Sequence, residues 1–188
     1  MNDLSGYDTV KHLMRMGDGL GFQGFGLVPW LIQKWSPQLS HFAIVQEFPT
    51  WCGSENRRWT SEAIGGGVGP RYLSKVLENY HGHIWWYPLK PEFEDYRKEI
   101  GMAATELFGT GYDFQGIFKQ VFARVSLNLS RLWCSEYIQA CYLKAKLTDI
   151  LVGLYPSEIP EKIPIFLEPI QIIHYEPEIG DPIPVVTP

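Results

Sequence analysis

The chain has 188 residues, of which 45% are hydrophobic and 20% charged, a balance typical of a folded globular protein rather than a disordered one. Its formal net charge is -5 and no lysine- or arginine-rich block occurs, which argues against a general nucleic-acid binder. No stretch is long enough to span a bilayer and the first residues lack an apolar signal core, so we expect a cytoplasmic protein without a membrane span.

The first residues predict a lead-in followed by a glycine-rich strand. Residues 1–16 look like a short amphipathic segment, and over residues 17–24 Leu20 and Phe22 alternate with small or polar residues. The glycines of this stretch fit neither the dinucleotide-binding nor the phosphate-loop pattern, so we attribute them to close approach of a neighbouring backbone. Residues 27–35 then predict a short apolar helix or turn.

Residues 41–48 form the clearest strand of the first half. Their period of two places His41 and Ala43 on one face and Phe42 on the other. His41 therefore lies at the start of a mostly buried strand, where an imidazole can be held in one orientation. Two interpretations stay open at this point: a catalytic base, or a histidine that merely satisfies the end of the strand.

A further strand is predicted over residues 58–64, and it carries the carboxylate Glu62. We expect it to pair with the strand over residues 41–48 through a loop that holds Cys52. The glycine-rich run over residues 65–70 predicts a turn that ends this strand. Apolar residues at helical spacing then predict a helix over residues 72–80.

Another strand is predicted over residues 83–88. His83 is its first residue, and His81 lies two positions before it. His81 and His83 are two positions apart, so they can share a strand face and offer two imidazoles to a metal ion. No Asp, Glu or Cys joins them at ligand spacing. A solvated start of the strand is therefore the preferred interpretation, and we expect neither a metal nor another cofactor.

Two helices are predicted in the following part of the chain. Pro91 begins a helix whose apolar residues recur at spacings of three and four as far as Phe108. Gly109 follows at the position where a left-handed helix end favours glycine. Asp113 is suited to cap a further helix over residues 114–126.

A helix is predicted to begin at a cysteine, over residues 134–146, because apolar residues recur there at spacings of three and four. Ser135 and Glu136 suit its first turn. Cys134 then lies where unpaired backbone amides and the helix dipole favour a thiolate, the form that attacks a carbonyl carbon. A buried, inert cysteine is the alternative, because free cysteine is among the most buried residue types.

The cysteines form no disulfide framework. There are three, and Cys134 and Cys141 lie about 10 Å apart along one helix, too far to bridge without distortion. This usage favours a reducing compartment.

The amino-acid composition changes after Leu151, where prolines recur and are expected to interrupt every possible helix. Residues 163–173 can still give one or two short strands, and the last dozen residues predict a loose tail. We therefore predict one domain over residues 1–188, with a Pro-rich C-terminal extension from about residue 152.

Several segments of the chain together resemble the circularly permuted papain-like cysteine enzymes, that is, the YiiX-like permuted NlpC-type amidases, with lecithin:retinol acyltransferase as a more distant relative. The segments are Gly17-Asp18, Ser40 to Val45, Ser61-Glu62-Ala63, Gly111-Tyr112-Asp113 and Trp133 to Tyr137. The resemblance implies an α+β, papain-like fold in which a small antiparallel sheet packs against the helix that carries the cysteine.

The same resemblance implies roles for individual residues. It makes Cys134 the nucleophile, His41 the base and Glu62 the third, polar member. Glu47 shares the face of His41 but lies too far along the strand to hold the imidazole. The resemblance also implies substrate or oxyanion contacts for Asp18, Tyr112, Ser135 and Glu136. Of these, Glu136 packs the site or caps the helix and is not the base.

The implied activity is that of a thiol hydrolase or acyltransferase. It cleaves an amide or ester bond of a cell-wall peptide or a lipid-linked acyl substrate through a thioester, while the amide of Cys134 and one further donor hold the oxyanion. The expected partner is a small-molecule, peptide or lipid-linked substrate. Two alternatives stay open: an inactive binding or structural module on the same fold, and a metal protein that uses His81 and His83.

Overall fold

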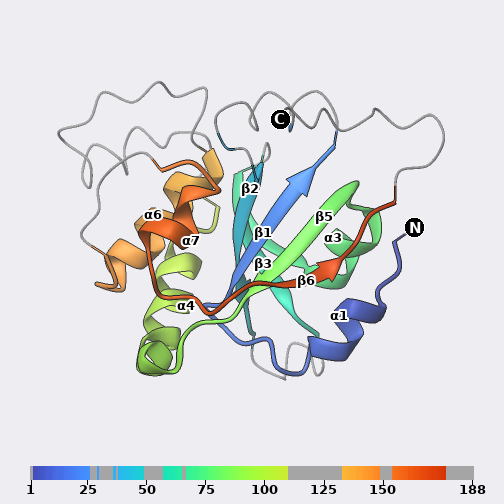
Figure 1. Cartoon of the computed structure of the whole chain (residues 1–188). Coiled ribbons are helices and arrows are strands. Elements are labelled where there is room, and N and C mark those ends of the chain that lie inside the picture. The colour runs from blue at the N-terminus through green and yellow to red at the C-terminus, as the bar shows by residue number, and fades with distance from the viewer. Residues whose placement is uncertain are drawn as a thin grey trace.

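The structure is a computed structural model that describes residues 2–25, 29, 36, 38–48, 57–64, 67–109, 133–148 and 154–176. Figure 1 shows its elements, which are α1 (Ser5–Val10), β1 (Gly19–Gly24), β2 (His41–Gln46), β3 (Trp59–Ile64), β4 (Gly67–Tyr72), α3 (Leu73–Asn79), β5 (Gly82–Tyr87), the 3₁₀ helix η2 (Pro91–Tyr96), α4 (Arg97–Glu106), α6 (Trp133–Lys144), α7 (Glu158–Lys162) and β6 (Ile170–Ile173). Within these residues, every helix is too short or too polar to cross a membrane.

The centre of the structure is a six-stranded sheet in the order β4-β3-β2-β1-β5-β6. Each neighbouring pair is antiparallel. The expected antiparallel sheet of an α+β protein is therefore confirmed, and β3 pairs with β2 as the sequence indicated. This pairing brings the start of β2 close to the end of β3.

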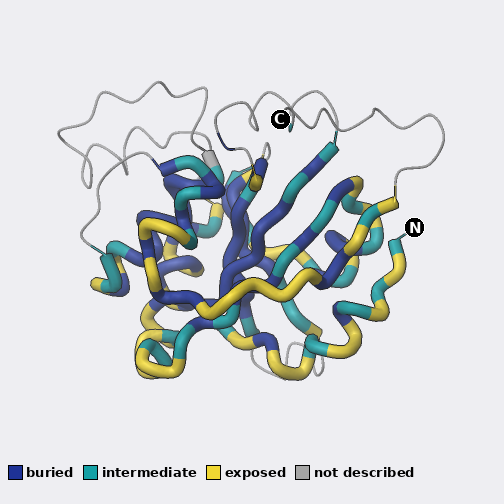
Figure 2. The backbone as a smooth tube through the Cα atoms, in the orientation of Figure 1, coloured by how far each residue is buried: buried dark blue, intermediate teal, exposed yellow. Residues whose placement is uncertain are grey.

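Each face of the sheet carries a buried apolar cluster, and β2 contributes to both. Figure 2 shows that the central strands β1 and β2 are mostly buried. Phe42 packs in one cluster with Tyr137 of α6 and with residues of α4 and α7. Ala43 packs in a second cluster with Leu73 of α3 and with α1. The predicted assignment of alternate β2 residues to opposite faces is thus confirmed. Each large side chain buried in this way contributes about 1.5–3 kcal/mol.

The glycine-rich run after β3 differs from its prediction. Residues 65–70 were expected to form a turn, but Gly67–Tyr72 is the strand β4, paired with β3 over its whole length. β4 lies at the edge of the sheet. An edge strand tolerates a proline such as Pro70, because the outer side of the strand needs no ladder donor. The prediction of a turn was therefore wrong for all but residues 65 and 66, which lie outside the described part.

The helical predictions hold with two changes. Residues 91–108 contain the short 3₁₀ helix η2 before α4, and Gly109 has the expected left-handed conformation with φ 73°. The prolines beyond residue 151 do not exclude every helix, because α7 contains Pro160. Pro160 lies in the first turn, where backbone N–H groups have no acceptor within the helix, so its missing donor is not needed.

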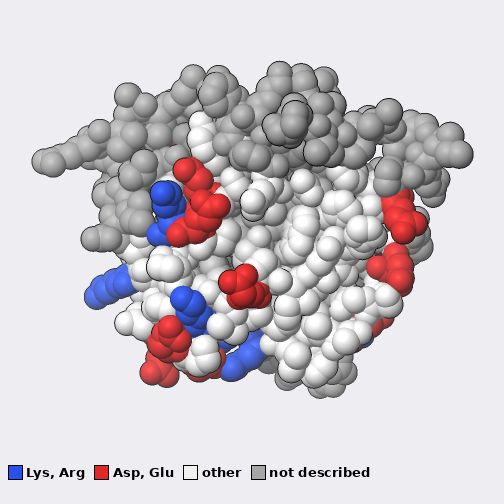
Figure 3. Space-filling model, viewed as in Figure 1, with Lys and Arg blue, Asp and Glu red and all other residues white. Residues whose placement is uncertain are grey.

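Some predictions fall outside the described residues. They are the helix or turn over residues 27–35 apart from Pro29, the loop with Cys52, Tyr112, Asp113, the helix over residues 114–126 and the tail. The short strand expected within residues 163–173 is confirmed as β6. On the face drawn in Figure 3, the Lys and Arg side chains of the described residues lie interspersed with Asp and Glu.

Candidate active site

His41 and Glu62 meet across the pairing of β2 with β3. The register Ile44↔Ser61 places His41 and Glu62 on the same face of the sheet as diagonal neighbours. Nε2 of His41 lies 2.8 Å from Oε2 of Glu62. The Glu62 side chain is only 2% exposed and that of His41 is 19% exposed. The carboxylate therefore orients the ring from inside the protein.

Cys134 reaches the same imidazole from the first turn of α6. Its sulfur interacts with the His41 side chain and with the backbone N–H groups of Phe42 and Ser135, and each of these interactions lowers the pKa of the thiol. Because Nε2 of His41 is bonded to Glu62, Nδ1 is the ring nitrogen left for Cys134. The structure therefore brings together the three residues that the resemblance singled out, in the order sulfur, imidazole, carboxylate.

The charges of these groups support one another. Burial alone raises the pKa of Cys134, but the His41 charge and the hydrogen bonds from His41, Phe42 and Ser135 outweigh it and lower that pKa below its ordinary value. Burial alone lowers the pKa of His41, but the Cys134 sulfur and the Glu62 carboxylate outweigh it and raise that pKa. Each group therefore favours the charged form of the other, and a thiolate beside an imidazolium is the reactive form of such a pair.

Two buried hydroxyl groups fix α6 against the sheet beside this site. The Tyr137 hydroxyl is hydrogen-bonded to Ser61, the residue next to Glu62, and it donates to the carbonyl oxygen of Ala104 on α4 at 3.3 Å. These bonds tie the helix that carries Cys134 to the strand that carries Glu62. A shift of α6 along the sheet would break them, so they help to keep the thiol on the imidazole.

The sequence reasoning missed several residues around His41. The Phe22 ring lies 5.2 Å from the His41 ring, and the Tyr80 ring packs edge-on against Phe22 at 5.1 Å. Arg71 donates to Oε1 of Glu62 at 3.2 Å. Strand alternation does place Phe22 on the face of His41. Arg71 was not predicted to lie near Glu62, because residues 65–70 were assigned to a turn instead of to a strand paired with β3.

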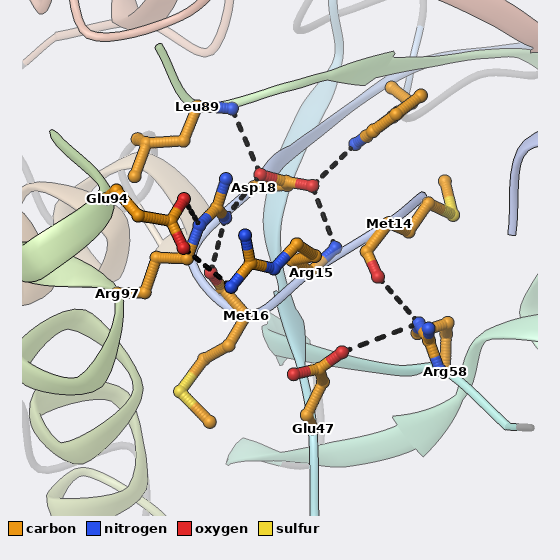
Figure 4. A network of polar contacts seen from close by, with 10 residues as sticks. Met14, Arg15, Met16, Asp18, Glu47, Arg58, Leu89, Glu94 and Arg97 are labelled. Atoms are coloured by element: carbon orange, nitrogen blue, oxygen red, sulfur yellow. Dashed lines mark hydrogen bonds and ion pairs between the residues drawn. The ribbon is translucent and has the colours of Figure 1, made fainter. Parts of the chain in front are cut away.

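Asp18 directly precedes Gly19, whereas His41 pairs with Phe22 further along β1, so Asp18 and His41 lie at opposite ends of this strand pair. Figure 4 shows the separate environment of Asp18. Its carboxylate is 1% exposed and accepts four hydrogen bonds, from Arg15 N (2.9 Å), Trp86 Nε1 (2.9 Å), Leu89 N (3.0 Å) and Arg97 Nη1 (2.7 Å). These bonds join the start of β1 to the end of β5 and to α4. The structure thus does not bring Asp18 to the candidate site, and all its bonds support the fold.

The remaining residues predicted to contact the substrate or the oxyanion are Ser135, Glu136 and Tyr112, of which the structure describes the first two. Ser135 contacts the Cys134 sulfur through its backbone N–H, while its buried hydroxyl has no hydrogen-bond partner among the described residues. Glu136 is 4% exposed, and its Oε1 likewise lacks a partner there. Tyr112 lies outside the described residues. Neither carboxylate oxygen of Glu136 is among the groups that shift the pKa of Cys134.

Burial raises the pKa of Glu136 to about 7. The unfolded chain titrates this carboxyl near 4.5, so its contribution to stability is full below pH 4.5 and is lost as the pH rises through about 7. We expect Glu136→Gln, which cannot ionise, to gain ~2–3 kcal/mol in unfolding free energy relative to wild type between pH 5 and pH 9. Urea unfolding at several pH values measures this gain.

The matched control for this prediction is Glu99→Gln, which removes a negative charge from an exposed position on α4. It should show no comparable gain between pH 5 and pH 9. A Glu136→Gln variant whose stability runs parallel to wild type across that range would mean that the buried carboxyl does not titrate as described.

His81 and His83, the two histidines considered as metal ligands, both contact Tyr175, which lies just after β6. Nδ1 of His83 accepts a hydrogen bond from Tyr175 N at 3.2 Å, and the His81 ring stacks on the Tyr175 ring at 5.6 Å. A nitrogen that accepts a backbone N–H has its lone pair occupied. Among the described residues, no group of three or more His, Cys, Asp or Glu side chains is arranged to hold a metal ion.

Comparison with known proteins supports the fold alone. No protein-family model matches the sequence, and no curated protein matches it either. Among solved structures, the chain is similar to the crystal structure of the metalloprotein YiiX from Escherichia coli O157:H7, DUF1105. The two share 18% identity at a TM-score of 0.52, covering 85% of this chain and 89% of the YiiX chain. The chain therefore has a YiiX-like α+β fold.

Proposed function

We propose that this chain is a cysteine-dependent hydrolase or acyltransferase, built as a permuted papain-like enzyme, that cleaves an amide or ester bond through a thioester. The observation that carries the proposal is the meeting of Cys134, His41 and Glu62, with Oε2 of Glu62 2.8 Å from Nε2 of His41 and the Cys134 sulfur interacting with the same imidazole. A nucleophile, a base and a group that orients the base are what covalent acyl transfer requires.

The proposed reaction has two halves. The Cys134 thiolate attacks the acyl carbon, and His41 gives its proton to the leaving amine or alcohol as the bond to the acyl group breaks. His41, now neutral, then takes a proton from water or from another acceptor, which attacks the thioester and releases the acyl group with Cys134 restored as thiolate. The amides at the start of α6 have no acceptor within the helix, so the Cys134 amide is our first candidate for the oxyanion.

A metal centre fits the same three side chains less well, although YiiX is described as a metalloprotein. Cys, His and Glu are all possible ligands, but one imidazole nitrogen binds one metal ion. Glu62 lies at Nε2 of His41, and within the part of the chain that the structure describes no group of three or more His, Cys, Asp or Glu side chains is arranged to hold a metal ion. The three side chains therefore fit proton transfer better than metal binding.

The test is a panel of acyl-amide, peptidoglycan-peptide and lipid-ester substrates, assayed by product release and by intact mass for an acyl-enzyme. We expect turnover of at least one class, lost in Cys134→Ala and abolished by iodoacetamide but not by a chelator. The matched control is Cys141→Ala, which removes a buried thiol two turns along the same helix and should retain activity. Equal activity of wild type and Cys134→Ala would overturn the proposal.

A further inference from the structure

The Glu62 carboxylate has a second partner that the proposed chemistry does not yet use. Its Oε2 is bonded to His41, and its Oε1 accepts a hydrogen bond from Nη1 of Arg71 at 3.2 Å. The carboxylate is 2% exposed, whereas the Arg71 side chain is 46% exposed. A buried carboxylate therefore lies between two cationic groups, one inside the site and one at its surface.

The pairing of β3 with β4 explains how Arg71 reaches this oxygen. The register pairs Thr60 with Arg71 and Glu62 with Gly69, so Glu62 and Arg71 are diagonal neighbours on one face. Gly69, directly opposite Glu62, has no side chain, and a Cβ added there would meet no atom within 4 Å. The open position beside Glu62 leaves room for the guanidinium to cross.

We propose that Arg71 is a positioning residue of the candidate site, which holds the Glu62 carboxylate ionised and turned toward His41 so that His41 in turn stays bonded to Cys134. This inference rests on the proposed function. A buried carboxylate that loses one of two partners keeps its full desolvation cost and loses part of what offsets it. Without Arg71, Glu62 therefore binds a proton more readily, and the imidazolium beside the thiolate loses its anionic support.

The electrostatics agree with this geometry. Burial alone raises the pKa of Glu62, while the hydrogen bonds and charges of His41 and Arg71 outweigh it and lower that pKa. The titratable and charged groups that act on Glu62 and Cys134 are His41 from β2, Arg71 from β4, Cys134 itself from α6 and the Tyr80 phenol that follows α3. Among these groups, Arg71 is the permanent cation.

The experiment follows the thiolate of Cys134 by its ultraviolet absorbance as a function of pH, taken as the difference from the Cys134→Ser variant so that the other thiols cancel. We expect Arg71→Gln to move the titration midpoint upward by about half a pH unit, since half-exposed ion pairs are worth only a fraction of a kcal/mol to about one. Arg71→Lys should restore part of the shift. Lys75→Gln removes an exposed cation of α3 as the matched control and should leave the midpoint unchanged.

A double-mutant cycle with Glu62→Gln separates positioning from a simple charge effect. If Arg71 acts through Glu62, adding Arg71→Gln to Glu62→Gln should produce no further shift. A shift of equal size in both backgrounds would mean that Arg71 acts directly on the thiolate through space, which overturns the inference. Thermal melting of each variant shows that the compared proteins are folded.

The outcomes also distinguish this inference from the function it rests on. If wild type shows no Cys134 thiolate below the ordinary thiol range, the proposed cysteine chemistry fails. If wild type shows that thiolate and Arg71→Gln titrates identically, the chemistry stands and the role of Arg71 is refuted.

Discussion

Replacing His41 with Ala should slow the alkylation of Cys134 by iodoacetamide at pH 6 by between about tenfold and a hundredfold. In wild type, the charge and hydrogen bond of His41 lower the pKa of Cys134 against the opposing effect of burial. Without the imidazole, burial dominates and little thiolate remains at pH 6. The loss is smaller than the change in thiolate fraction, because a more basic thiolate is also the better nucleophile.

Peptide mapping by mass spectrometry measures this rate for each cysteine separately. Cys141 is an internal reference, since burial raises its pKa to about 12 and its side chain is fully buried. It should label far more slowly than Cys134, which is partly exposed. The matched control is His83→Ala, which removes a half-buried imidazole from β5 and should leave the rate unchanged. Equal, slow labelling of Cys134 and Cys141 in wild type would favour a binding module.

Replacing Asp18 with Asn should lower the unfolding free energy by about 3–5 kcal/mol. Asp18 is a buried carboxylate that accepts four hydrogen bonds, one of them from Arg97. Asn keeps the shape but removes the charge, and its amide group puts N–H donors where two of these donors point. In a protein of this size, we expect the melting temperature to fall by about 10 °C.

Denaturant and thermal unfolding measure this loss, with Asp8→Asn as the matched control. Asp8 of α1 is exposed and pairs with Lys11, which directly follows the helix, so its replacement should change stability by less than about 0.5 kcal/mol. Because Asp18 lies away from the candidate site, folded Asp18→Asn should still alkylate at Cys134 at the wild-type rate. A stable variant with slow alkylation would instead give Asp18 a part in the chemistry.

Much of the local structure follows from the order of residues. The period of two in residues 41–48 predicts which face His41 shares, and the spacing of apolar residues after Cys134 predicts α6. Both predictions succeed because side-chain direction depends on backbone geometry alone. The turn predicted over residues 65–70 failed for the opposite reason, since whether Gly67 and Pro70 can form a strand depends on their place at the edge of the sheet.

The fate of the carboxylates shows where sequence reasoning stops. Glu62, Glu136 and Asp18 were all assigned to the site region by resemblance, yet only Glu62 is bonded to His41. Asp18 accepts hydrogen bonds from Trp86 and Arg97, and Oε1 of the buried Glu136 has no partner among the described residues. The type of a residue and its position in the sequence do not determine which hydrogen-bond donor its buried carboxylate will contact.

The sequence by itself determined the chemically capable residues and their local settings: a cysteine at the start of a helix, a histidine at the start of a strand, and a carboxylate on the next strand. Only the tertiary structure decided that Cys134, His41 and Glu62 meet, that Arg71 takes the second carboxylate oxygen, and that Asp18 serves the fold. Local periodicity sets the direction of each side chain. Contact between distant segments depends on strand order, register and the seating of α6 on the sheet, which the whole core fixes together.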